Sequence, residues 1–115
     1  MSRKHHDLRV WQRSIDLVKE VYRLTSSFPA EERFALNAQM RRAKISAPSN
    51  SAEGAARSTV KEYSHFLYMA RGSLSELETQ LVIARILGYS DEKGEIDTML
   101  EDVFALLSGL IRSKE

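Results

Sequence analysis

The chain of 115 residues has the length of one ordinary domain and can bury a substantial hydrophobic core. Its 43% hydrophobic and 29% charged residues exclude a wholly disordered chain, and the absence of cysteine excludes disulfides and thiolate metal sites. No apolar run approaches the ~20 residues that cross a bilayer, and no signal-like apolar segment follows Asp7, so we expect a cytoplasmic protein with no membrane partner.

The formal net charge of +1 is unevenly distributed along the chain. Residues 1–61 contain 12 Lys and Arg against 6 Asp and Glu, whereas residues 62–115 contain 5 against 10. This division permits a basic face for nucleic acid. It also permits the two halves to attract each other, within one chain or between subunits, and we favour this second interpretation.

The first expected helix, residues 8–27, has a wide apolar surface. At 100° per residue, its apolar side chains form two stripes that together exceed the ~100° face a surface helix buries, and we interpret the extra width as a subunit contact. The first stripe contains Leu8, Trp11, Ile15, Val18 and Tyr22. The second contains Phe28 and the four residues that we predict as the oligomer interface, Val10, Leu17, Val21 and Leu24.

The second expected helix, residues 30–56, follows Pro29, which suits a first helical turn, and its early acids Glu31 and Glu32 complement the helix dipole. Pro48 lies inside this helix, where proline costs ~3 kcal/mol because a backbone hydrogen bond is lost, so we predict a bend near Pro48. The side chains of its seam become smaller toward its end, which indicates that a neighbouring element packs very close. The seam consists of Leu36, Met40, Ala43, Ala47, Asn50 and Gly54.

A capping box, Thr59 with Glu62, opens the third expected helix, residues 59–87. Its seam repeats at spacings of 4 and 3 without a break, as in a coiled coil or helix bundle. The seam consists of Tyr63, Leu67, Ala70, Leu74, Leu77, Leu81, Ala84 and Gly88. The fourth expected helix, residues 92–112, has the seam Ile96, Met99, Leu100, Val103, Leu107 and Leu110.

Short connections of about two to four residues place consecutive helices side by side and antiparallel. The predicted fold is therefore all-α: one domain over residues 1–115, an antiparallel up-down-up-down four-helix bundle.

Polar residues on the second and third helices could face each other inside this bundle. We expect Asn50 and Glu53 to be buried, with Arg42 or Arg71 as the charge partner, because buried polar groups can fix helix register. The expected structural polar network consists of Arg42, Asn50, Glu53, Arg71 and Glu76.

The sequence offers little for catalysis or metal binding. His5 and His6 are adjacent, His65 stands alone, and no second Glu-x-x-His copy accompanies the half-match at Glu62, so a bundle-core metal site is disfavoured. No serine has a credible base partner. We expect no enzymatic activity, no cofactor and no small-molecule substrate.

Nucleic-acid binding would need clustered positive charge, and the chain offers two modest groups, the basic head and part of the second helix. Symmetric assembly would multiply them by presenting one copy per subunit. The candidate nucleic-acid-binding residues are Arg3, Lys4, Arg9, Arg13, Arg41 and Lys44.

Five stretches of the chain together resemble one bacterial family, the four-helix-bundle proteins encoded in intervening sequences of 23S ribosomal RNA genes. They are Leu8-x-Val10-Trp11-Gln12, Phe28-Pro29-x-Glu31 with Leu36, Gln39-Met40-Arg41-Arg42-Ala43, Ser46-x-Pro48-x-Asn50-x-Ala52-Glu53-Gly54, and Phe66-Leu67-Tyr68-x-Ala70-Arg71-Gly72-Ser73 with Glu76-Leu77-Glu78. The resemblance covers almost the whole chain. Ala47, Ser49 and Ser51 depart from it, since larger or more apolar residues often occur there.

The resemblance implies a left-handed bundle that assembles into a homopentameric ring, in a family with no established enzymatic activity. Accessory proteins of diversity-generating retroelements look similar in fold, and they use a basic ring to bind nucleic acid and a reverse transcriptase. Two hypotheses follow: an oligomeric bundle that binds RNA or DNA electrostatically through a basic ring surface, or a protein–protein interaction scaffold without nucleic-acid binding.

Overall fold

The computed structural model describes residues 8–32, 35–90 and 94–115, and within these ranges it contains helices and no strand. This confirms the all-α, four-helix prediction. The elements are α1 (Arg9–Thr25), the short 3₁₀ helix η2 (Ala30–Glu32), α2 (Leu36–Ala55), α3 (Val60–Ile86) and α4 (Glu95–Ser113).

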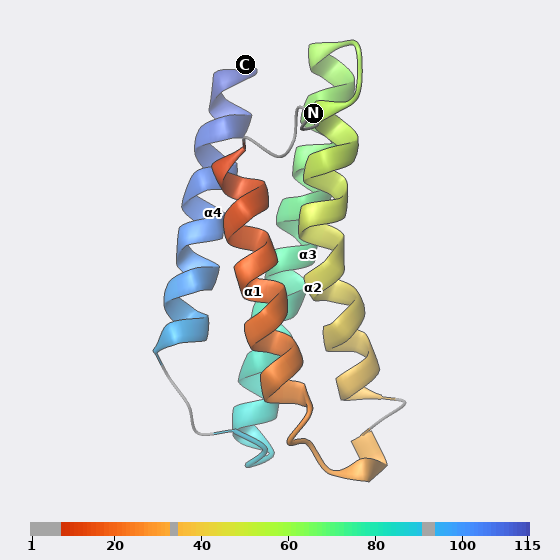
Figure 1. The fold of residues 1–115 in the computed structure, drawn as a ribbon, viewed down its shortest axis with the longest axis vertical. Helices are drawn as coiled ribbons and strands as arrows, with labels where there is room; N and C mark the ends of the chain where they lie inside the picture. Colours follow the sequence, from red (N-terminus) through yellow and green to blue (C-terminus); the bar gives the residue numbers. More distant parts are fainter. Residues whose placement is uncertain (1–7, 33–34, 91–93) are drawn as a thin grey trace.

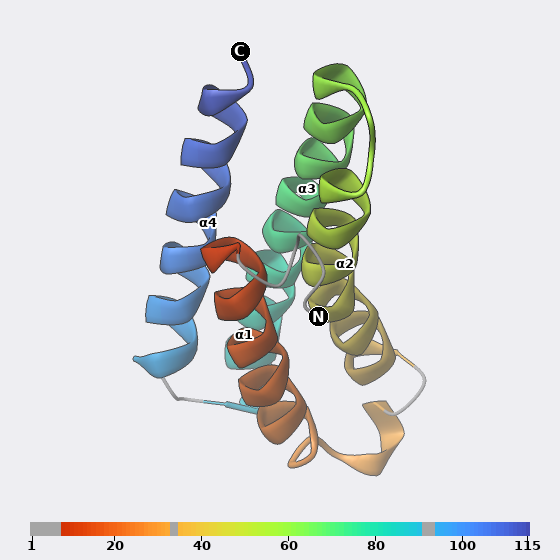
Figure 2. The ribbon, with the colours of Figure 1, turned by 45° about the horizontal axis from the view of Figure 1, so that its top comes forward.

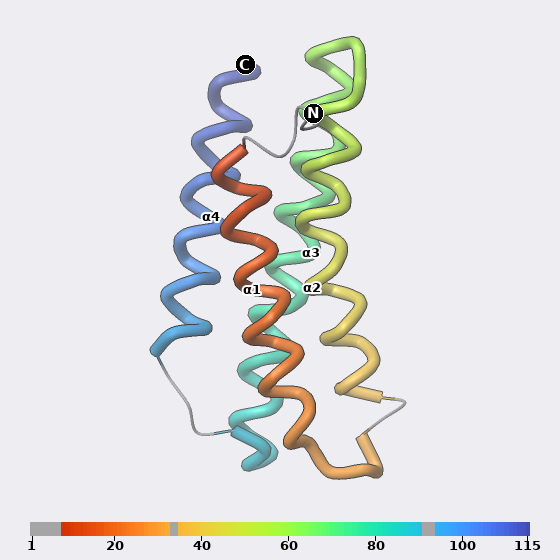
Figure 3. Tube along the Cα trace, viewed as in Figure 1, coloured from red at the N-terminus to blue at the C-terminus, as the bar shows by residue number. Residues whose placement is uncertain are grey.

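Consecutive helices run in opposite directions, as Figure 1 shows: α1 descends, α2 ascends, α3 descends and α4 ascends. Both α1 and α3 pack against α2 and α4, so α1 and α3 occupy opposite corners of the bundle (Figure 2). The start of α1 and the end of α4 lie at the same end as the α2–α3 connection (Figure 3). With principal extents of 43 × 24 × 22 Å, the molecule is elongated along the helices.

The seam of α3 forms the centre of the core, as its unbroken spacing predicts. Leu67, Leu74 and Leu77 have no exposed surface, and neither do Ala70 and Ala84. Burial of one leucine side chain contributes roughly 1.5–3 kcal/mol. The other helices meet this seam with residues that are at most 1% exposed: Leu17, Val21, Met40, Ala47, Val103 and Leu107.

The helix ends differ from the sequence expectation at one important place. Residues 30–32 form a single 3₁₀ turn, and α2 begins only at Leu36. The turn is held by a tertiary contact, because Tyr89 Oη donates a hydrogen bond of 2.5 Å to Glu32 Oε2 and the Phe28 and Tyr89 rings lie 5.5 Å apart. That hydrogen bond and burial raise the pKa of Tyr89 to about 12. A contact between residues 57 positions apart is invisible to local helix signals.

Pro48 lies inside α2 and does not end it. The side chains of Asn50 and Ser51 donate to the carbonyl oxygens of Ser46 and Ala47, at 2.9 and 2.8 Å. Such back-bonding often accompanies bent helices. The bend near Pro48 itself stays a prediction.

The small residues near the end of α2 let α3 approach closely, as the shrinking seam predicts. A Cβ atom added at Gly54 would lie 3.1 Å from Phe66 Cβ and 3.2 Å from the Tyr63 carbonyl oxygen. A Cβ atom added at Gly72, on the outer side of α3, would have no atom within 4 Å. The two glycines therefore provide matched substitution sites, one closely packed and one open.

We expect Gly54→Ala to destabilise the protein by ~1–3 kcal/mol through overpacking, less the helix-propensity gain of up to ~1 kcal/mol. Gly72→Ala should stabilise it by up to ~1 kcal/mol, because it gains the propensity without a clash. Denaturant unfolding of the two variants measures both effects. Equal stability of the two variants would contradict the close α2–α3 contact.

Candidate nucleic-acid interface

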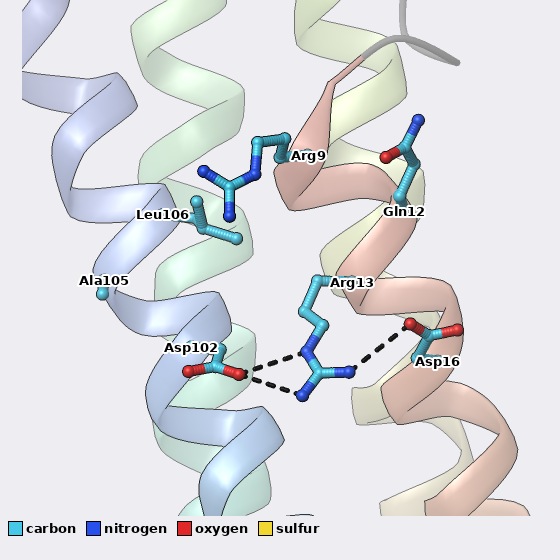
Figure 4. A pocket seen from close by; sticks show the side chains of 7 residues that line it. All are labelled: Arg9, Gln12, Arg13, Asp16, Asp102, Ala105 and Leu106. Atoms are coloured by element: carbon cyan, nitrogen blue, oxygen red, sulfur yellow. Dashed lines mark hydrogen bonds and ion pairs between the residues drawn. The ribbon is translucent and has the colours of Figure 1, made fainter.

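Arg9 and Arg13, two of the predicted basic residues, line a hollow of about 450 Å³ between α1 and α4 (Figure 4). Arg13 donates from Nε and Nη2 to Asp102 Oδ2 at 3.2 and 2.9 Å, and its Nη1 lies 3.5 Å from Asp16 Oδ2. The hydrogen bond to Asp102 raises the pKa of Arg13. Two carboxylates therefore offset the charge of Arg13, which connects α1 to α4. The Arg13 guanidinium is therefore poorly placed to bind a phosphate.

Arg9 lines the same hollow but is exposed, and no ion pair joins it to another residue in the described ranges. Figure 4 shows its side chain extending toward Leu106 on α4. Of the two predicted residues at this place, Arg9 alone keeps its charge open to a ligand.

The second group surrounds an aromatic ring on α1. Tyr22 is 55% exposed, and Arg41 Cζ and Lys44 Nζ lie 4.2 and 4.3 Å from its ring centroid. Arg41 Nε also donates to Thr25 Oγ1 at 3.1 Å, near the end of α1. In the part of the chain that the structure describes, no carboxylate forms an ion pair with Arg41 or Lys44. The Tyr22 cluster, defined as Tyr22, Arg41 and Lys44, therefore carries uncompensated positive charge.

Lys44 is 3% exposed although it has no carboxylate partner. Burial, with a smaller effect of the nearby Arg41 charge, lowers the pKa of Lys44 to about 8. A bound anion would offset this cost, since an opposite charge favours the protonated amine.

The structure thus divides the predicted nucleic-acid residues into two groups on different seams of the bundle. Arg9 and Tyr22 are 13 residues apart on α1, roughly 20 Å at ~1.5 Å per residue. Arg3 and Lys4 lie outside the described residues. The sequence did not indicate the role of Tyr22, because its cationic neighbours lie about 20 positions away on another helix.

The predicted oligomer interface is wrong. Val10, Leu17, Val21 and Leu24 are 0–6% exposed and belong to the core of their own chain. The other stripe of α1 borders solvent, with Trp11, Ile15 and Val18 lining an outer groove. Both stripes have helical spacing, so periodicity alone could not tell which one faces the core.

The expected burial of Glu53 is also wrong. Glu53 is exposed, and its Oε1 accepts a hydrogen bond of 2.7 Å from Arg57 Nη2, one turn away on the same chain. Gly54 contacts α3, and its neighbour Glu53 points ~100° away around the helix. The Glu53 side chain therefore lies on the solvent side of the α2 seam.

The remaining members of the expected polar network do not converge either. Arg42 and Glu76 are exposed, and Arg71 Cζ lies 4.8 Å above the Tyr68 ring. A smaller network joins the helices instead. Asn50 Nδ2 and Ser73 Oγ both donate to Ser46 Oγ, at 2.8 and 2.7 Å.

The described ranges contain no group of three or more His, Asp or Glu side chains placed to hold a metal ion. His65 is exposed, with its ring 5.4 Å from that of Phe66, whereas His5 and His6 lie outside the described residues. No described helix has the length and apolarity needed to span a membrane.

Comparison with known families decides which family this bundle represents. The model of the family described as 23S rRNA-intervening sequence protein matches residues 6–109. The chain belongs to this family. The match includes all of α1, α2 and α3 and most of α4, and hence the Tyr22 cluster and the hollow of Figure 4. A comparison with curated proteins found no match.

We expect Glu53→Ala to lower the free energy of unfolding by no more than ~0.5 kcal/mol, because an exposed ion pair between residues one turn apart contributes ~0.3–0.5 kcal/mol. Asn50→Ala should cost more, ~1 kcal/mol, since it removes the part-buried hydrogen bonds from the Asn50 amide to the carbonyl oxygen and hydroxyl of Ser46. Denaturant unfolding compares the two. A larger loss for Glu53→Ala would show that its carboxylate is needed elsewhere.

Proposed function

We propose that this member of the 23S rRNA-intervening sequence protein family is a non-enzymatic protein that assembles with copies of itself and binds RNA or DNA electrostatically. The subunit number that we propose, five, rests on the family resemblance, as do the basic ring surface and a bacterial, cytoplasmic setting. No cofactor or small-molecule substrate is part of the proposal.

The Tyr22 cluster is the observation that carries the nucleic-acid part of this proposal. The exposed Tyr22 ring holds a pair of cations by cation–π contact, and this pair supplies positive charge for the phosphates of a nucleic-acid strand. Nothing in the cluster reads base edges, so the binding is expected to be independent of sequence.

Exposed apolar side chains support the assembly part of the proposal. Ile86 is 77% exposed, and Ile45 and Leu87 are 52% and 51% exposed. Ile45 belongs to α2, whereas Ile86 and Leu87 lie at the end of α3, so two helices expose apolar side chains that contact with another copy would cover. In a ring, each subunit presents its own Tyr22 cluster, so weak contacts add up along one nucleic-acid strand.

The second candidate function is a protein–protein interaction scaffold without nucleic-acid binding. The observation that favours it is the Arg13 contact with Asp102 and Asp16, which uses basic charge inside the chain. The binding experiment described next separates the two candidates.

We expect labelled single-stranded RNA and DNA to bind at ~50 mM salt and to bind far more weakly at ~200 mM, because neutralised phosphates release counterions. Arg41→Gln should weaken binding and reduce the log–log salt slope by ~0.7 for each lost phosphate contact with a single strand. Fluorescence anisotropy measures both effects.

Arg13→Gln is the matched control, since it removes an arginine whose charge two carboxylates already offset, and it should change binding less than Arg41→Gln. Circular dichroism and light scattering check that both variants keep their fold and assembly. Absence of binding at ~50 mM salt would end the nucleic-acid proposal and leave the scaffold.

Binding should also weaken between pH 7 and pH 9. Lys44, with its pKa lowered to about 8, carries its charge at the lower pH and loses it at the higher pH, where it no longer attracts phosphate. In Lys44→Met this pH dependence should be reduced, which isolates Lys44 from other groups that titrate nearby. An identical pH profile in both proteins would remove Lys44 from the interface.

A further inference from the structure

An apolar groove runs along the outer side of the α1–α2 seam. Its volume is about 300 Å³, and it is lined by Trp11, Ile15, Val18, Ile45, Pro48, Ser49 and Ala52. Ile45 is 52% exposed although it is apolar. A groove of this kind between two helices suits the apolar face of a third helix.

The outer face of α3 presents such a surface. Tyr68, Val82 and Ile86 are 47%, 47% and 77% exposed. Six residues recur along this face at spacings of 4, 3, 4, 3 and 4, the period of a helix-packing seam. This outer stripe consists of Tyr68, Gly72, Ser75, Thr79, Val82 and Ile86.

The middle of the outer stripe is built for close approach. Gly72, Ser75 and Thr79 are small and exposed, and the position of a Cβ atom on Gly72 is open, with no atom within 4 Å. The inner seam of α3, by contrast, is fully packed within its own chain. The helix therefore has two seams, and only one of them is occupied.

Four exposed side chains give the borders of the two surfaces charges of opposite sign, although Arg71, over the Tyr68 ring, adds one positive charge beside the outer stripe. Lys19 and Arg42 are exposed beside the groove, one turn from Ile15 and Ile45, respectively. Glu76 and Glu78 are exposed beside the outer stripe. Within the described ranges none of these four side chains is in an ion pair. The signs of these charges follow the sequence, in which residues 1–61 have a basic excess and residues 62–115 an acidic excess.

We propose that the α1–α2 groove binds the outer stripe of α3 from a second copy of the chain. The pairing cannot form within one chain, because α1 and α3 occupy opposite corners of the bundle (Figures 1 and 2). It deepens the self-assembly of the proposed function and rests on it. Since the two surfaces differ, the contact is heterologous, and repetition of such a contact closes a ring or extends a filament.

Complementation between two variants tests this pairing. Ile45→Glu disables the groove and Ile86→Glu disables the outer stripe, and both sites are exposed enough to leave the fold intact. Each variant alone should be a monomer by light scattering behind size exclusion. An equimolar mixture should form a 1:1 heterodimer, because one intact stripe meets one intact groove and growth then stops.

Val60→Glu is the matched control, since Val60 is 57% exposed but lies outside the outer stripe, and it should assemble like the wild type. Trp11, the only tryptophan, provides a second readout because it lines the groove. Its emission should shift to the blue when the two variants are mixed. Gly72→Leu should weaken assembly while the melting temperature of the monomer is kept or raised.

The outcomes separate the surfaces from the proposed function. A wild-type protein that is monomeric at every concentration would overturn self-assembly and this pairing together. A wild-type assembly that persists in both variants would overturn the pairing and leave the proposed function standing. Monomeric variants that form no heterodimer on mixing would overturn the pairing of the groove with the outer stripe.

Discussion

The inner seam of α3 is the constraint on which the rest of the structure depends. Its leucine and alanine side chains are at most 3% exposed over six successive seam positions, so α2 and α4 have to pack against one continuous apolar strip, with α1 at the opposite corner. The strip combines four leucines with two alanines, and such large and small side chains let neighbouring helices interlock at native packing density. Packing of α2 against this helix leads to the close contact at Gly54, where an added Cβ atom would lie only 3.1–3.2 Å from atoms of Tyr63 and Phe66.

Ion pairs between the helices lie around this packed core. Arg13 pairs with Asp102 across α1 and α4, and Arg85 Nη2 lies 2.6 Å from Asp97 Oδ2 across α3 and α4, so α4 is tied to the bundle on both sides. The α1–α2 seam lacks an ion pair of this kind among the described residues and holds Arg41 and Lys44 around Tyr22 instead. The charge of Arg41 and Lys44 on the α1–α2 seam is therefore not offset by a carboxylate among the described residues, unlike that of Arg13 and Arg85.

Much of the fold could be predicted because the relevant signals are local. The heptad spacing of α3 and the Thr59 cap appear in the structure as expected, with Thr59 Oγ1 accepting from the Glu62 amide at 3.1 Å. The start of α2 was misplaced because Glu32 is held by Tyr89, a contact that depends on how the loops meet. Candidate site residues were harder to predict, since whether Arg13 or Arg41 can meet a phosphate depends on which carboxylates fold against each of them.

The sequence by itself determined the helical class, the inner seam and family membership, since these follow from spacing and residue identity along the chain. Only the tertiary structure decided which of two equally periodic stripes of α1 became core and which remained outside. It also decided that Glu53 pairs with Arg57 and that Lys44 is buried without a carboxylate partner among the described residues. The physical reason is that periodicity gives the angle of a side chain around its own helix, whereas burial depends on what the neighbouring helices place opposite to it.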